Sequence, residues 1–74
     1  MSNKINIGQA IKEKKEQLGL GTTELANKTN IDKRQVYRIF KKKSIDTDEL
    51  FELSTQLNYD FFKLYSDELA DRIA

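Results

Sequence analysis

Apolar residues recur at spacings of three and four along most of the 74-residue chain, which is the spacing that lines one face of a helix. Proline is absent and glycine is confined to positions 8, 19 and 21, so few residues interrupt helix formation. No internal repeat, linker or low-complexity tract divides the sequence. The pattern predicts one all-α domain, a compact bundle of about five helices.

The first two predicted helices are separated by a glycine-containing turn. The first spans about residues 7–18, and its inward residues are Ile7, Ala10, Ile11 and Leu18. Gly19 follows at the position where a left-handed residue costs least and would end this helix. The second helix starts near Thr22, is short, and has Gly21 or Thr22 as its N-cap. Its buried face is predicted to contain Leu25 and Ala26.

A tight turn is predicted next, because Asn30 is among the few non-glycine residues that adopt the left-handed conformation readily. Ile31 would then plug into the core, and Asp32 is suited to cap a third helix over about residues 33–42. The inner face of this helix is predicted to carry Val36, Ile39 and Phe40, which leaves a charged outer face.

The remaining sequence predicts a fourth helix and a helical tail. Asp46 or Thr47 would cap the fourth helix, whose inward residues are Leu50, Leu53 and Leu57. In the tail, apolar residues spaced by four form a stripe made of Phe61, Tyr65, Leu69 and Ile73. Ser66 is a point where the tail could break and cap a short extra C-terminal helix. The predicted domain covers residues 1–74, with its core at about 7–65 and the tail at 66–74.

Charge is distributed unevenly along the chain, although the formal net charge is only +1. Residues 27–43 carry seven basic side chains against one acidic side chain, a net charge of +6, whereas residues 44–74 carry two against eight, a net charge of −6. Such a division fits a surface that binds a polyanion, on a domain whose other side repels it. The alternative is that both segments are solvated helix faces.

Composition excludes several kinds of chemistry. Cysteine and histidine are absent, which removes disulfides, thiolate chemistry and the commonest general base. Acidic pairs such as Asp48 and Glu52 have the i, i+4 spacing of a solvated helix surface. We therefore expect no enzyme, no metal site and no cofactor. The N-terminus does not resemble a signal peptide and no apolar run has membrane-spanning length, so we expect a cytoplasmic protein.

The segment TTELANKTNIDKRQVYRI resembles the helix-turn-helix of the lambda-repressor-like family, of Cro and xenobiotic-response-element type, and the similarity extends over about residues 7–65. Ala26 stands where the two helices would cross, and Asn30 stands at the turn position that is usually glycine. Two departures are Phe40, where many members have glutamate, and Lys42, where many have glycine, so the third helix continues farther or ends without a glycine cap. The run after it resembles more specifically small regulators of Bacteroidetes.

The resemblance implies a function and assigns roles to residues. The third helix would lie in the major groove of double-stranded DNA, where arginine pairs with guanine and glutamine with adenine. The candidate base-reading residues are Lys33, Arg34, Gln35, Tyr37 and Arg38, with the two arginines as the main readers. The candidate phosphate-binding residues are Thr22, Thr23, Lys28, Lys41, Lys42 and Lys43.

Family members usually act as dimers on inverted repeats, which implies a homodimeric, sequence-specific transcriptional regulator, by default a nucleoid-associated repressor without a small-molecule effector. The candidate dimerisation residues are Tyr65, Leu69 and Ile73. The alternative for this stripe is that Phe61 and Tyr65 close the core of the monomer. The alternative function is a protein-interaction module, such as an antitoxin or a regulator-binding domain, that binds DNA only weakly and without specificity.

Overall fold

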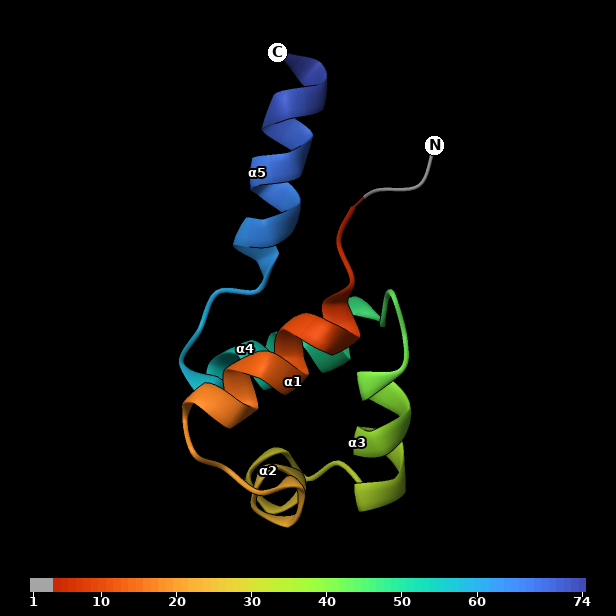
Figure 1. Ribbon diagram of the computed structural model, residues 1–74, viewed down its shortest axis with the longest axis vertical. Helices are drawn as coiled ribbons and strands as arrows, with labels where there is room; N and C mark the ends of the chain where they lie inside the picture. The colour runs from red at the N-terminus through yellow and green to blue at the C-terminus, as the bar shows by residue number, and fades with distance from the viewer. Residues whose placement is uncertain (1–3) are drawn as a thin grey trace.

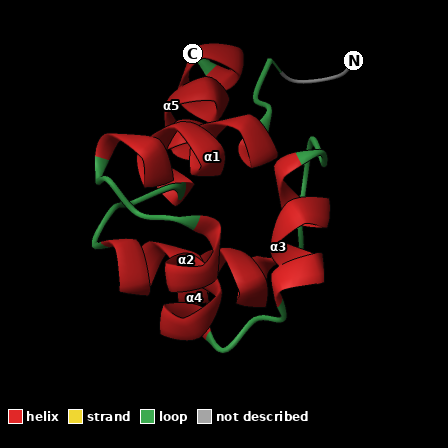
Figure 2. Ribbon diagram, turned by 60° about the horizontal axis from the view of Figure 1, so that its bottom comes forward, coloured by secondary structure: helices red, strands yellow, loops and turns green. Residues whose placement is uncertain are grey.

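The computed structural model describes residues 4–74, which form five helices joined by loops, with no strand among these residues (Figures 1 and 2). The helices are α1 (Ile7–Gln17), α2 (Thr22–Thr29), α3 (Lys33–Phe40), α4 (Thr47–Leu57) and α5 (Phe62–Ile73). The principal dimensions are 40 × 21 × 21 Å, because α5 extends beyond the other four helices (Figure 1). The predicted all-α bundle of about five helices is confirmed.

One apolar core joins the first four helices to the start of α5. Its buried residues are Ile7, Ile11, Leu25, Ala26, Val36, Ile39, Leu50, Leu53, Leu57 and Phe61. Each large member contributes about 1.5 to 3 kcal/mol by burial before the cost of ordering the chain. Because α3 packs against both α1 and α2, its inner residues Val36 and Ile39 hold the centre of this core.

The ends of α1 and α4 follow from local chemistry. The Asn6 side chain caps α1 by accepting a hydrogen bond from the Gln9 N–H at 3.2 Å, and the Asp46 carboxylate caps α4 by accepting from the Glu49 N–H at 2.8 Å. Gly19 has a φ of 71°, as predicted for the residue that ends the first helix. The prediction that Leu18 faces inward is wrong, because it is the C-cap of α1 and its side chain is exposed.

The turn between α2 and α3 is built on Asn30, whose φ of 57° confirms the predicted left-handed conformation. Gly21 is the N-cap of α2, and Asp32 occupies the N-cap of α3 without a capping hydrogen bond from its side chain. The predicted end of the third helix at residue 42 is wrong, because α3 ends at Phe40 with Lys41 as a right-handed cap. After Lys41 the chain turns toward α1, whose first N–H groups donate hydrogen bonds to the carbonyl groups of Lys42 and Lys43.

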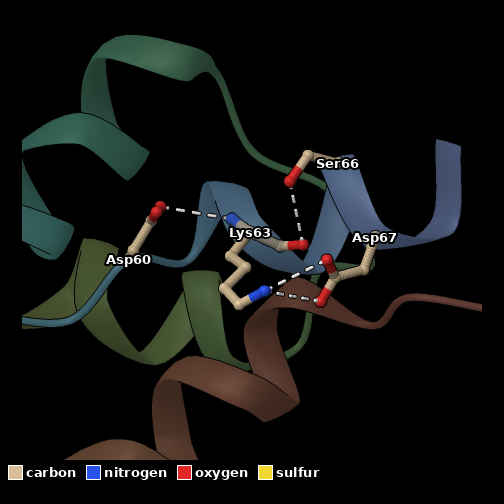
Figure 3. A network of polar contacts seen from close by, with 4 residues as sticks. All are labelled: Asp60, Lys63, Ser66 and Asp67. Carbon is tan, nitrogen blue, oxygen red and sulfur yellow. Dashed lines mark hydrogen bonds and ion pairs between the residues drawn. The ribbon is translucent and has the colours of Figure 1, made fainter. Parts of the chain in front are cut away.

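The tail is one continuous helix, so the predicted break and short extra helix at Ser66 are wrong. The Ser66 hydroxyl donates to the Lys63 carbonyl at 3.2 Å and is satisfied inside α5 (Figure 3). Phe61 is the N-cap of α5, and the carboxylate of Asp60, one residue earlier, accepts a hydrogen bond from the Lys63 N–H at 3.2 Å. The Lys63 ammonium pairs with Asp67 one turn later, at 3.2 Å (Figure 3).

Candidate nucleic-acid interface

Helix α3 has two chemically distinct faces. Val36 and Ile39 are buried beneath it, whereas most of the predicted base-reading residues lie on its solvent side. The exposed ones are Lys33, Arg34, Tyr37 and Arg38. Tyr37 keeps 50% of its surface exposed, and its ring meets the Phe40 ring edge-on with centroids 6.3 Å apart. The structure therefore brings together one tyrosine and three cationic side chains on a helix fixed from behind.

Gln35 differs from these four residues. Its side chain is half-buried, and its amide Nε2 donates to the Glu49 carboxylate on α4 at 3.2 Å. This contact joins the recognition segment to the first turn of α4 and occupies the amide donor that would pair with adenine. Sequence spacing alone could not reveal the pair, because the two residues are 14 positions apart.

The carboxyl end of α3 is held by the first residues of α1. The Ile7 N–H donates to the Lys43 carbonyl at 3.0 Å, and the Gly8 N–H donates to the Lys42 carbonyl at 2.9 Å. These are N–H groups that a helix start leaves without intrahelical partners. A Cβ on Gly8 would come within 3.0 Å of the backbone of Ile39 and Lys42, so only glycine fits. The orientation of α3 relative to α1 is thus set by backbone contacts.

A groove of about 210 Å³ lies beside α3, where α1 and α2 approach it. The residues that line it are Gln9, Lys12, Lys15, Thr22, Tyr37, Phe40 and Lys41. Three lysines line this groove together with Thr22, which lies in the first turn of α2, and ammonium and hydroxyl groups of this kind can bind a phosphate. Thr22 and Lys41 were predicted as phosphate-binding residues, whereas the lysines of α1 were not.

The missed lysines left a signal in the sequence. Lys12 and Lys15 are three residues apart in the sequence and so share a face of α1. Lys15 is also held in place, because its Nζ donates to the Leu20 carbonyl at 3.3 Å and lies 5.8 Å from the Phe40 ring centroid. The other predicted phosphate-binding residues, Thr23, Lys28, Lys42 and Lys43, are exposed and do not line the groove.

The predicted dimerisation residues lie on α5, away from α3 (Figure 1). Leu69 and Ile73 are 56% and 74% exposed, whereas Tyr65 is half-buried, and burial raises the pKa of its hydroxyl above the ordinary value of 10.0. A hollow of about 270 Å³ is lined by Ile5, Tyr65, Glu68, Leu69 and Arg72. The stripe is therefore partly core and partly accessible.

The five-helix fold, the left-handed turn between α2 and α3 and the exposed basic face of α3 define a helix-turn-helix domain. The profile of a helix-turn-helix family of the lambda-repressor and xenobiotic-response-element type matches residues 11–64, well over half of the chain. The chain therefore belongs to this DNA-binding family, and the resemblance seen in the sequence is confirmed. The match does not bear on the narrower resemblance to regulators of Bacteroidetes.

No curated protein and no solved structure matches the chain significantly. Within residues 4–74, no helix is long and apolar enough to cross a membrane. The family is one of DNA-binding regulators and not of enzymes.

Proposed function

We propose that the chain is a sequence-specific transcriptional repressor that inserts α3 into the major groove of double-stranded DNA. The observation that carries this proposal is the exposed basic face of α3, which is fixed from behind by the core and by α1. Arg34 and Arg38 are one turn apart, so both can reach base edges in one groove. Bidentate pairing with guanine would contribute about 1 to 3 kcal/mol of discrimination for each arginine.

Lys33 and Tyr37 flank these arginines and complete the proposed base-reading surface. Tyr37 offers a ring that can contact a thymine methyl group, because half of its surface is free. Gln35 would read a base only by exchanging its hydrogen bond to Glu49. Its amide therefore serves first to position α3 against α4.

Phosphate groups on both sides of the major groove would fix the register of α3. The proposed phosphate-binding residues are Thr22, Thr23, Lys28, Lys41, Lys42 and Lys43, together with Lys12 and Lys15 of the lysine-lined groove. Each lysine that neutralises a phosphate makes binding more sensitive to salt. The groove adds contacts from α1 and so widens the footprint beyond the helix-turn-helix itself.

Two copies would join through α5 and place two α3 helices on an inverted repeat with half-sites about 34 Å apart. Leu69 and Ile73 supply exposed apolar surface for this dimer, and Tyr65 borders the same hollow. Leu69→Glu places a charge in this contact and should shift the protein to the monomer in sedimentation equilibrium. An unchanged molar mass relative to the native chain would remove α5 from the proposal. Bound in this way beside a promoter, the nucleoid-associated dimer would repress by occlusion.

The testing experiment is selection from a randomised duplex pool, followed by affinity measurements on the enriched site. We expect an inverted repeat with guanines in each half-site. Arg34→Ala with Arg38→Ala should then weaken binding by about 2 to 6 kcal/mol. The matched control, Lys14→Ala with Lys63→Ala, removes the same charge from residues outside the proposed DNA surface.

Equal losses for the two double variants would show that only net charge matters and would refute base reading by the arginines. A pool that stays random would favour the alternative function, a protein-interaction module with weak, non-specific DNA binding. The acidic segment 44–74 is the feature that would support such a module.

A further inference from the structure

An aromatic surface lies at the carboxyl end of α4, where the chain turns into α5. Phe51 is 65% exposed on the outer side of α4, although its neighbour Leu50 is buried in the core. Phe51, Tyr59 and Phe62 line a hollow of about 440 Å³, together with Ser54, Asn58 and Asp60. Three aromatic rings around one open hollow form the kind of apolar patch that marks an interaction site.

The wall of this hollow is held by its own contacts. The Tyr59 ring packs edge-on against Phe61 with centroids 4.9 Å apart, and the Lys14 ammonium lies 4.3 Å from the centroid of the same ring. Asn58 adopts a left-handed φ of 51°, and the Asp60 carboxylate accepts a hydrogen bond from the Lys63 N–H at the start of α5 (Figure 3). A partner would therefore meet a surface that costs little to order.

The residues that surround the hollow from α4 and α5 are mainly acidic, and the Lys14 ammonium beside the Tyr59 ring is the cation that approaches from α1. Among the described residues that line it, Asp60 is the one with a charged side chain. Asp48 lies one turn before Phe51 and so on the same side of α4. Lys63, a basic residue that follows this loop in the sequence, is paired with Asp67 at 3.2 Å (Figure 3). With a net charge of −6 on residues 44–74, the electrostatic preference is for a cationic partner.

We propose that this hollow docks a partner protein through a segment that presents an aromatic or aliphatic anchor flanked by lysine or arginine. A second copy of this chain fits less well, because its own basic residues lie on the surface proposed for DNA. The loop between α4 and α5 lies across the molecule from α3 in both ribbon views (Figures 1 and 2). The partner can therefore be held while α3 is on DNA.

The test uses a phage-displayed library of short random peptides, selected on the native chain and depleted on Phe51→Ala. Enriched peptides should combine an apolar anchor with basic residues and bind Phe51→Ala at least about tenfold more weakly. Leu18→Ala, which truncates an exposed apolar residue at the C-cap of α1, is the matched control and should bind like the native chain. Asp48→Asn should weaken binding about two- to fivefold.

Because Phe51 is mostly exposed, Phe51→Ala should keep the native thermal midpoint, and the loss of binding can then be assigned to the surface. Amide shifts on peptide addition should concentrate within residues 51–62. Three outcomes would overturn the proposal: no peptide that depends on Phe51, enrichment of neutral or acidic peptides, or a self-association of the native chain that Phe51→Ala abolishes. No DNA is present, so the result is independent of the function proposed above.

Discussion

Gly8 is the position where one added methyl group should disturb both stability and the placement of α3. In Gly8→Ala the new Cβ would lie within 3.0 Å of the carbonyl oxygens of Ile39 and Lys42. Both obstacles are backbone atoms, which cannot rotate away as a side chain can. Relief requires α1 to move from α3, and this movement stretches the hydrogen bonds that the Ile7 and Gly8 N–H groups donate.

The magnitude follows from three opposing effects. Alanine is a better helix former than glycine and gains about 1 kcal/mol. Overpacking against a fixed backbone costs about 1 to 3 kcal/mol, and weakening two hydrogen bonds costs about 0.5 to 1.5 kcal/mol each. The net loss of unfolding free energy is about 1 to 5 kcal/mol, centred near 3. For a domain of this size, about 3 kcal/mol corresponds to a fall in Tm of about 12 to 24 °C.

Urea unfolding followed by circular dichroism would measure this loss. Gly21→Ala is the matched control, because its Cβ would meet only the Glu24 side chain, at 3.5 Å, which can move. The control should cost less than about 1 kcal/mol through its effect at the N-cap of α2. If Gly8→Ala were as stable as the native chain, the helix preference for alanine would outweigh any steric cost of the added Cβ. The close contact between α1 and the end of α3 would then be wrong.

Three smaller changes test individual contacts. Asn30→Gly should raise the unfolding free energy by about 1 kcal/mol, since glycine adopts the left-handed conformation without strain; a loss would mean that the Asn30 side chain stabilises the turn. Asp46→Ala should lower the unfolding free energy by about 1 kcal/mol by removing the cap on the Glu49 N–H, whereas Asp46→Asn should retain most of it. Burial raises the pKa of the Tyr65 hydroxyl in the folded state, so its contribution is complete below pH 10.0 and is lost as pH rises through the folded pKa. Tyr65→Phe should therefore flatten the alkaline part of the stability profile, and an unchanged slope would contradict this.

Elements governed by local chemistry were predictable from the sequence. Gly19 and Asn30 mark the ends of α1 and α2, because few other residues adopt a positive φ cheaply. The apolar spacing located Val36 and Ile39 in the core, since a helix places residues three apart on one face. These preferences depend on residues a few positions apart in the sequence, so packing of the helices does not change them.

Features that depend on two distant segments were not predictable. The Gln35 amide meets Glu49, and the N–H groups of Ile7 and Gly8 meet the carbonyls after α3, only because the helices pack. The same holds for the groove that is lined by two lysines of α1 and by Lys41, the C-cap of α3. The predicted helix break at Ser66 was wrong for a local reason. A serine hydroxyl can cap a new helix, but it can also donate to a carbonyl group of the preceding turn within one helix, as Ser66 does.

The segment 27–43 carries a net charge of +6 and also contains core residues of a small domain. The fold accommodates this charge because the basic side chains lie on the surface. The carbonyl groups of Lys42 and Lys43 accept hydrogen bonds from the first N–H groups of α1, while the side chains of both lysines are exposed. The negative end of the α3 dipole lies beside both these lysines and the positive end of α1, so the cations and the helix start are stabilised together. Backbone atoms thus set the orientation of α3, and side chains of the same residues remain free for a polyanion.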